Sequence, residues 1–373
     1  MSEGNTSRLQ RDNYVDIGKG IAIIAVVLGH ISFDYSFLMA FWPVAFFFFV
    51  AGFYIKEERL CTPLKFILHK LKTIYMPGTI IYLIAVLLHN CFVDMGWYPL
   101  GSSHPMTGKA FVYWDICTLF QNIVKTIFAP NGELAMGAMW FLYSLFFSLS
   151  FLSILSLLCK IVSNKTHLSY DWLRCLSIVM LASVSIALTQ FDITIPRISN
   201  SITIMAVIYC GMMIKRRWRT GFDNSLCFLI AVVILLQYTL LPHPWQSFPT
   251  NKFPDVMAPI IKGGSATYIV LYLSKMLNRL KPLSLFFSYV GRNSLYIMAL
   301  HIIGLFLCNS LLLSLGVADE MTMSASLYTF KIGSNYTILF LYLLFGLSFP
   351  LLSIEFFRIV KRSIIVLCQK FQS

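Results

Sequence analysis

Charged side chains are scarce in this sequence. Only 12% of its 373 residues are Asp, Glu, Lys or Arg, whereas 58% are hydrophobic, and the mean hydropathy is +0.74. A soluble domain of this length needs roughly 25% charged residues to cover its surface, so this composition excludes a soluble globular protein. The sequence predicts an all-α, polytopic membrane helical bundle.

Acidic residues are scarcer still, with 16 Asp and Glu against 29 Lys and Arg, which gives a net charge of +13. Such a balance is also seen in nucleic-acid-binding proteins. When the N-terminus is placed in the cytoplasm, however, 23 of the 29 Lys and Arg residues fall on the cytoplasmic side of the predicted spans. This asymmetry follows the positive-inside rule of membrane proteins. It predicts an even number of spans, cytoplasmic termini and no nucleic-acid partner.

The nine cysteines form no Cys-x-x-Cys pair and no His/Cys spacing typical of a metal site, so no metal is predicted. Only Cys91 and Cys117 are placed to face outward together, which leaves a disulfide between them open. The first apolar run has no cleavage site and continues into a second helix, which argues against a signal peptide. No internal repeat and no second soluble domain is visible.

Apolar runs long enough to cross a bilayer need roughly 20 residues, and about ten are present. They form a single predicted membrane domain over residues 1–373, with an outer loop at 94–135 and a very short first turn near Asp34. Within that loop, the stretch 96–108 is rich in turn formers, and 114–128 has helical apolar spacing. The latter is interpreted either as an interfacial helix or as a helix packed on the bundle. The predicted spans are 17–34, 38–55, 74–93, 136–159, 173–190, 200–214, 222–241, 256–274, 285–312 and 335–357.

The first span carries an Asp, a Lys and a His. At 100° per residue, Lys19 and His30 lie about 20° apart on one helix face and about 16 Å apart along the axis, and Asp16 lies on the same stripe. Charged groups inside a span usually face a cavity or a partner. The stripe suits an elongated anionic ligand that enters from the cytoplasm, with His30 at its reactive end. The alternative is two snorkelling interfacial charges and a hydrogen-bonded core histidine.

Five stretches resemble the membrane-bound acyltransferase 3 family, and most closely its branch of fucose-4-O-acetylase-like sugar O-acetyltransferases. The opening helix matches the family's Asp, Lys-Gly and Gly-His pattern, with ten residues between Lys19 and His30. The sequence departs from the family at Ala51, where a Ser is usual, and at Thr73, where a basic residue is usual. The matching stretches are VDIGKGIAIIAVVLGHI, FFFFVAGFYIK, HKLKTIYMP, MWFLYSLFF and YVGRNSLYIMALHI.

The resemblance implies a multi-pass enzyme of the bacterial inner (plasma) membrane with about ten helices around a central cavity. It implies transfer of an acetyl group from cytoplasmic acetyl-CoA to a hydroxyl of a sugar in a surface glycan or its precursor. Acetyl-CoA is then the acyl-donor substrate, a sugar or glycan is the acceptor, membrane lipids surround the protein, and no cofactor is bound permanently. The alternatives of acetyl or succinyl, of direct transfer or an acyl-histidine intermediate, and of oligomeric state stay open.

His30 is the predicted general base or transient acyl carrier. Lys19 is predicted to bind CoA phosphate, and Asp16 to orient Lys19 or to cap the helix; a simple local salt bridge between them is the alternative. Three further cations at the cytoplasmic rim are predicted to bind phosphate groups, although they also fit ordinary positive-inside charge. These are Lys70, Lys72 and Arg292.

Three residues of the predicted span 285–312 are further candidate site residues. Asn293 is a candidate donor to a carbonyl or thioester oxygen. Ser294 lies on the same helix face as His301, about 20° away. His301 is predicted at the depth of His30, where it shapes the site or positions the acceptor; a packed, hydrogen-bonded core histidine is the alternative.

On the outer side, Trp140 is a candidate to stack on a sugar or to anchor in the aromatic belt. Arg197 and Lys262 lie in or beside outer half-spans and are candidates to bind the acceptor or to shape the site. An intramembrane Lys is by default a site hypothesis, so Lys262 is predicted to contact an anionic acceptor or to pair with an acid, with snorkelling as the alternative. Glu133 is expected to be a solvated loop charge or an acceptor of sugar hydroxyls. No role is predicted for the five other histidines, His69, His89, His104, His167 and His243.

A membrane transporter or flippase for a sugar or lipid-linked glycan is the main rival function. Ten spans with few charges and a central Lys, Asp and His set also suit a proton-coupled carrier. Against this, the sequence shows no inverted repeat and no pair of broken helices. A structural subunit of a glycan-export complex is a third reading, and nothing in the sequence argues for it directly.

Overall fold

Every named element of the described part of the chain is helical. The computed structural model describes residues 12–39, 41–102, 110–128, 133–217, 221–240, 246–317 and 328–372. In chain order the elements are α1 (Asn13–Gly29), η1 (Ser36–Met39), α2 (Trp42–Phe53), α3 (Glu57–Leu60), α4 (Pro63–Lys70), η2 (Leu71–Tyr75), α5 (Met76–Leu87), α6 (His89–Asp94), α7 (Ile116–Phe128), η3 (Leu134–Met139), α8 (Trp140–Thr166), α9 (Tyr170–Gln190), α10 (Ile198–Arg217), α11 (Ser225–Leu240), α12 (Met257–Leu277), α13 (Lys281–Arg292), α14 (Ser294–Ser314) and α15 (Tyr336–Gln372).

Seven stretches of the described residues are helical, long and apolar enough to cross a bilayer. Large apolar side chains stay exposed on them, such as Ile84, Met180 and Phe356, which is expected where the solvent is lipid. The all-α membrane fold is thereby confirmed. The seven stretches are Ser36–Phe53, Pro63–Leu87, Leu134–Thr166, Tyr170–Gln190, Ile198–Arg216, Ser294–Ser314 and Tyr336–Ser363.

The predicted count of about ten spans is not confirmed. The predicted spans 17–34, 222–241 and 256–274 correspond to α1, α11 and α12, which do not meet the same criteria of length and apolarity. The predicted span 285–312 is two helices, because the chain bends at Asn293 between α13 and α14. An apolar run shows that residues are buried or in lipid, but it does not show where the helix axis turns.

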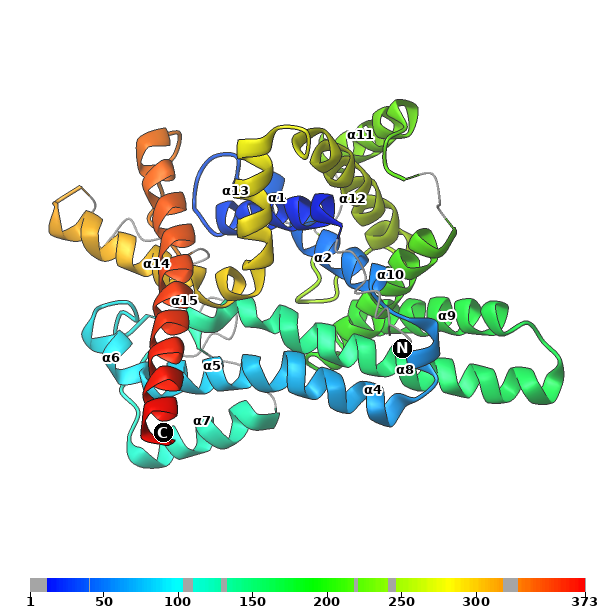
Figure 1. The fold of residues 1–373 in the computed structure, drawn as a ribbon, viewed down its shortest axis with the longest axis horizontal. Coiled ribbons are helices and arrows are strands. Elements are labelled where there is room, and N and C mark those ends of the chain that lie inside the picture. The colour runs from blue at the N-terminus through cyan, green and yellow to red at the C-terminus, as the bar shows by residue number, and fades with distance from the viewer. Residues whose placement is uncertain are drawn as a thin grey trace.

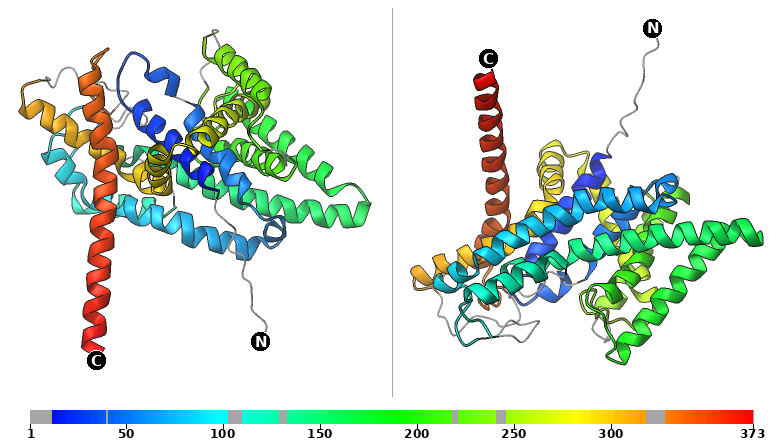
Figure 2. Two further views of the ribbon diagram at one scale, coloured as in Figure 1. Left: turned by 45° about the horizontal axis from the view of Figure 1, so that its top comes forward. Right: turned by 90° about the horizontal axis from the view of Figure 1, so that it is seen from below.

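The helices are arranged around α1 and α2 (Figure 1). Helices α8 and α9 form a long antiparallel hairpin, and the continuous α4–η2–α5 helix runs beside α8. Helix α10 packs on both α2 and α8. Figure 2 shows the last helix, α15, packed against α14 and extending well beyond the rest of the bundle at its C-terminal end.

Helices α1 and α13 cross in direct backbone contact (Figure 1). A Cβ atom on Gly291 would lie 1.8 Å from the carbonyl oxygen of Asp16, and one on Gly20 would lie 2.1 Å from the carbonyl oxygen of Phe287. Small residues let membrane helices approach this closely. The crossing fixes the junction of α13 and α14 beside the first turns of α1.

The connection between α1 and α2 is longer than the predicted short turn near Asp34. Helix α1 ends at Gly29, and residues 30–41 lead to α2 through η1. The connection is held by the segment after α14: the Ser32 amide donates to Thr329 Oγ1 (2.8 Å), and the Ile332 amide donates to the Ser32 carbonyl (3.0 Å). Because α1 ends at Gly29, His30 is the C-terminal cap of this helix and does not lie inside it.

A cluster of buried polar side chains surrounds Glu133, which lies directly before η3. Glu133 is 2% exposed, its Oε1 lies 2.8 Å from His89 Nδ1, and its Oε2 accepts a hydrogen bond from the Tyr98 hydroxyl (2.8 Å). The His89 ring stacks on Trp114 with centroids 3.5 Å apart. The expectation that Glu133 is a solvated loop charge is wrong, because long-range partners on α6 and in the outer loop enclose it.

Replacing Glu133 with Ala is expected to destabilise the protein by about 3 kcal/mol or more, because removing one member of a buried pair leaves the other without compensation. Thermal unfolding in detergent measures the effect. The matched control is Glu58→Ala, which removes an exposed carboxylate of α3. Equal melting temperatures for the two variants would contradict a buried pair.

Three further predictions from the sequence can be compared with the structure. The predicted helix at 114–128 is confirmed as α7, and it packs on the helix of Tyr75, whose hydroxyl donates to the Ile127 carbonyl (2.9 Å). Cys91 and Cys117 are exposed and are not bonded to each other. Part of the turn-rich stretch 96–108 lies outside the described residues, as do Arg8, Arg11, His104, Lys109, Arg219 and His243.

Candidate active site

Two histidines that are far apart in the sequence meet at the end of α1. The rings of His30 and His301 lie edge to face, with centroids 4.9 Å apart. The Tyr328 ring lies 5.3 Å from His30 on the segment that follows α14. The prediction that His301 lies at the depth of His30 is therefore confirmed. The two helices and this segment bring three titratable rings into one place.

Backbone carbonyls orient both imidazoles. His30 Nδ1 lies 2.8 Å from the Val26 carbonyl oxygen, and His301 Nδ1 lies 2.8 Å from that of Ile297. A carbonyl oxygen only accepts hydrogen bonds, so Nδ1 carries the proton in each ring and Nε2 presents a lone pair when the ring is neutral. His301 is fully buried and its Nε2 has no partner among the described atoms, whereas His30 is only half-buried. The tautomer held by the Val26 carbonyl leaves Nε2 as the ring nitrogen of His30 that can accept a proton.

Tyr328 is a residue of this site that the sequence did not indicate. A Cβ atom on Gly137 would lie 2.2 Å from the Tyr328 hydroxyl, so the phenol reaches the backbone of η3. The Tyr328 carbonyl accepts a hydrogen bond from the Asn309 amide of α14 (3.2 Å). Its neighbours in the sequence form no motif, and its place depends on the fold of the segment after α14.

Lys19 and Asp16 lie together near the other end of α1. Lys19 Nζ is 3.6 Å from Asp16 Oδ1 and 5.1 Å from the centre of the Tyr54 ring, which caps α2. Asp16 is 2% exposed. Arg292 follows Gly291, whose backbone touches that of Asp16, so the α1–α13 crossing brings its exposed side chain to the same end of α1. Three of the predicted donor-binding residues thus lie close to one another.

The other predicted donor-binding residues lie elsewhere. Lys70 ends α4, with its Nζ 5.4 Å from the centre of the Phe66 ring, and the exposed Lys72 lies in η2; both elements pack on α8. The buried Asn293 donates to the Tyr289 carbonyl (2.9 Å) and accepts from Arg358 (2.9 Å), so its amide ties α13 to α15. Ser294 begins α14 and is half-buried.

The predicted outer residues lie in three different places. Trp140 begins α8 and packs edge to face on Phe141. Lys262 of α12 places its Nζ 4.8 Å from the centre of the Phe41 ring. Arg197 precedes α10, and its guanidinium group interacts electrostatically with the phenols of Tyr82 and Tyr143.

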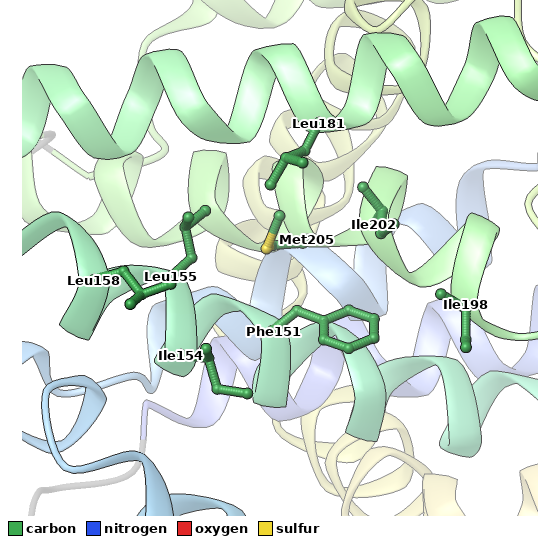
Figure 3. A pocket seen from close by; sticks show the side chains of 8 residues that line it. All are labelled: Phe151, Ile154, Leu155, Leu158, Leu181, Ile198, Ile202 and Met205. Carbon is green, nitrogen blue, oxygen red and sulfur yellow. The ribbon is translucent and has the colours of Figure 1, made fainter.

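A pocket of about 340 Å³ opens between α8, α9 and α10 (Figure 3). Its lining is entirely apolar and includes Phe151, Leu155, Leu181 and Met205. The lining residues Ile154 and Leu158 are also exposed on the outside of the bundle. Without a polar group this pocket offers nothing to bind phosphate or sugar, so the candidate active site stays at His30.

Comparison with known protein families identifies this chain's similarity to one of them. A family model described as an acyltransferase domain (Acyl_transf_3) matches residues 12–355, which include α1 to α14 and most of the transmembrane part of α15. No curated protein and no solved structure matches the chain significantly.

Proposed function

Because the chain belongs to the acyltransferase 3 family and is a membrane acyltransferase, we propose that it transfers an acetyl group from cytoplasmic acetyl-CoA to a sugar hydroxyl. The acceptor we propose is a sugar of a surface glycan or of its precursor, as in the fucose-4-O-acetylase-like branch that the motifs resemble. The observation that carries the proposal is the pair of His30 and His301, with the free Nε2 of His30 at one end of α1 and Lys19 near the other.

The reaction follows from this arrangement. His30 Nε2 takes the proton of the sugar hydroxyl while its oxygen attacks the thioester carbonyl carbon. The new C–O bond forms, the C–S bond breaks, and the sulfur of CoA leaves as a thiolate that regains the proton from His30. The Val26 carbonyl keeps the Nδ1 proton of His30 in place, so that Nε2 is the atom that titrates. His301 supplies a second ring nitrogen next to the imidazolium that forms.

At the cytoplasmic end we propose that Lys19 binds the phosphates of CoA and that Asp16 orients Lys19. A compact ammonium group suits a phosphate, and the exposed Arg292 beside it adds a second positive charge. Lys70 and Lys72 on the α4–η2 helix are proposed to attract the anionic donor towards the same membrane face. No cofactor is proposed beyond acetyl-CoA itself.

The experiment that tests the proposal is acetyl-CoA turnover by the purified protein in detergent, with a panel of neutral and acidic saccharides as acceptors. Free thiol release reports the chemistry, and mass spectrometry identifies the acetylated sugar. Acceptor-dependent thiol release supports the proposal. Binding of a saccharide with neither binding nor turnover of acetyl-CoA would instead favour the transporter.

Replacing Lys19 with Ala is expected to raise the KM for acetyl-CoA about 10-fold, because a hydrogen bond to a charged group contributes about 1.5–3 kcal/mol. The kcat should change little, since Lys19 binds the donor far from the reacting carbonyl. Steady-state kinetics with varied acetyl-CoA measure both constants. Lys361→Ala, which removes an exposed charge of α15, is the control, and a KM unchanged in both variants would contradict the role of Lys19.

A further inference from the structure

A second polar cluster lies where α5, α8 and α10 meet. Three of its buried side-chain atoms have no hydrogen-bond partner among the described residues, namely Arg197 Nε, Asn200 Oδ1 and Thr203 Oγ1, while the buried hydroxyls of Thr79 and Tyr143 lie within reach of each other. Buried polar groups in folded proteins nearly always have a partner, which is a protein group, an ordered water or a ligand. A group of them in one place therefore indicates a binding site.

The geometry of the helices brings these residues together. Thr79 and Tyr82 lie three residues apart on one face of α5, Asn200 and Thr203 lie three residues apart on α10, and Arg197 directly precedes α10. The Tyr82 and Tyr143 rings are 6.4 Å apart, which joins α5 to α8. The Asn200 amide donates to Ser144 Oγ (3.0 Å), which joins α10 to α8.

Arg197 gives the cluster its charge. No carboxylate in the described ranges forms an ion pair with its guanidinium group, and the phenols of Tyr82 and Tyr143 are near enough to interact with it electrostatically. Its backbone is left-handed, with φ 67°, which is uncommon for a residue other than glycine. Because burial of an unpaired charge is costly, a partly buried cation without a carboxylate partner favours the binding of an anion. Guanidinium groups bind carboxylate or phosphate through two parallel hydrogen bonds.

A short path of backbone connects this cluster to the histidine pair. The Tyr82 hydroxyl accepts a hydrogen bond from the Glu133 amide (3.0 Å), and Glu133 precedes η3. Four residues later Gly137 meets the hydroxyl of Tyr328, whose ring lies 5.3 Å from His30. Four residues of backbone span at most about 14 Å even when fully extended. A short saccharide can span such a separation.

From these contacts we infer that Arg197, with the hydroxyls of Tyr82 and Tyr143, binds an oxyanion of the acceptor. The oxyanion is either the carboxylate of an acidic sugar or the phosphate that links a glycan to its lipid carrier. This inference rests on the proposed function for the identity of the ligand as an acceptor. It adds that the sugar hydroxyl reaches His30 because its negatively charged neighbour is held at Arg197.

The test is a binding titration of the full-length protein in detergent, followed by calorimetry and without acetyl-CoA. The three probes are a trisaccharide of hexuronic acid, the neutral trisaccharide of the same length, and a short-chain polyprenyl diphosphate. We expect one of the two anionic probes to bind at least 10-fold more tightly than the neutral one. Tighter binding of the uronate identifies an acidic sugar, and tighter binding of the diphosphate identifies the carrier phosphate.

Arg197→Gln is expected to remove this preference and to leave the affinity for the neutral trisaccharide within about twofold. Tyr143→Phe removes one hydroxyl and is expected to weaken only the anionic probe, severalfold, and it serves where Arg197→Gln does not fold. Lys252→Gln, which removes an exposed cation before α12, is the matched control. An anionic preference that survives in Tyr143→Phe and Arg197→Gln alike, or that is absent from the unaltered protein, overturns the inference.

The same titration with His30→Ala separates this inference from the proposed function. The anionic preference should persist in that variant, because His30 lies outside the cluster. A preference for the anion with no acetyl transfer by the unaltered protein would retain the binding site and overturn the acyltransferase proposal. Acetyl transfer with equal kcat/KM for neutral and acidic acceptors would retain the acyltransferase proposal and overturn the anion-binding site.

Discussion

Replacing His30 with Ala is expected to reduce acetyl transfer by about 10²- to 10⁴-fold, the usual contribution of a general base. The reason is local. His30 caps α1, its Nδ1 proton is held by the Val26 carbonyl, and its Nε2 is the ring nitrogen with access to a substrate. His301 is not expected to replace it, because the His301 side chain is fully buried. Thiol release from acetyl-CoA in the presence of an acceptor measures the change.

The His30 variant needs a folding control, since a residue at a helix end can contribute to stability. The melting temperature and gel-filtration profile of His30→Ala should match those of the unaltered protein. His69→Ala removes an exposed histidine of α4 and should keep full activity. Full activity in a folded His30→Ala would instead mean that another group takes the proton.

The second large effect is expected for Gly291→Leu, at the crossing of α1 and α13. The first added carbon alone would lie 1.8 Å from the Asp16 carbonyl oxygen and 2.8 Å from the Gly20 nitrogen. Both contacts are to backbone, so no side chain can move aside and the helices must separate. Overpacking of this kind costs about 1–3 kcal/mol or more. The separation also moves the start of α14, and with it His301, away from His30.

We therefore expect Gly291→Leu to lower both the yield of folded protein and the activity of what remains. Gly264→Ala in α12 is the control, because its Cβ would lie 3.5 Å from the Phe49 ring, which is an ordinary contact. Thermal unfolding and acetyl transfer are measured for both variants. A Gly291→Leu protein with unaltered stability would show that the crossing is not tightly packed.

Some of this protein followed directly from its sequence. The membrane-embedded helices are visible as long apolar runs, because the cost of polar groups in lipid acts on each segment by itself. The family resemblance and the proposed roles of His30, Lys19 and His301 come from short motifs, each with its spacing within one helix. The equal depth of His30 and His301 was predicted for the same reason.

Other features depend on contacts between distant segments. The bend at Asn293 is stabilised by Arg358 of α15, and the burial of Glu133 depends on His89 and Tyr98. Neither bend nor burial has a local signature, so the sequence predicted one straight span and a solvated charge. Tyr328 likewise belongs to the site only because the segment after α14 pairs with the connection that follows His30.

The sequence by itself determined that this chain is a helical membrane protein of the acyltransferase 3 family with a histidine at the end of its first helix. The tertiary structure decided which side chains join that histidine and which polar groups are left without partners around Arg197. The physical reason is that hydropathy and helical periodicity are properties of neighbouring residues. The crossing at Gly20 and Gly291, by contrast, is set by packing between two glycines that are 271 residues apart in the chain.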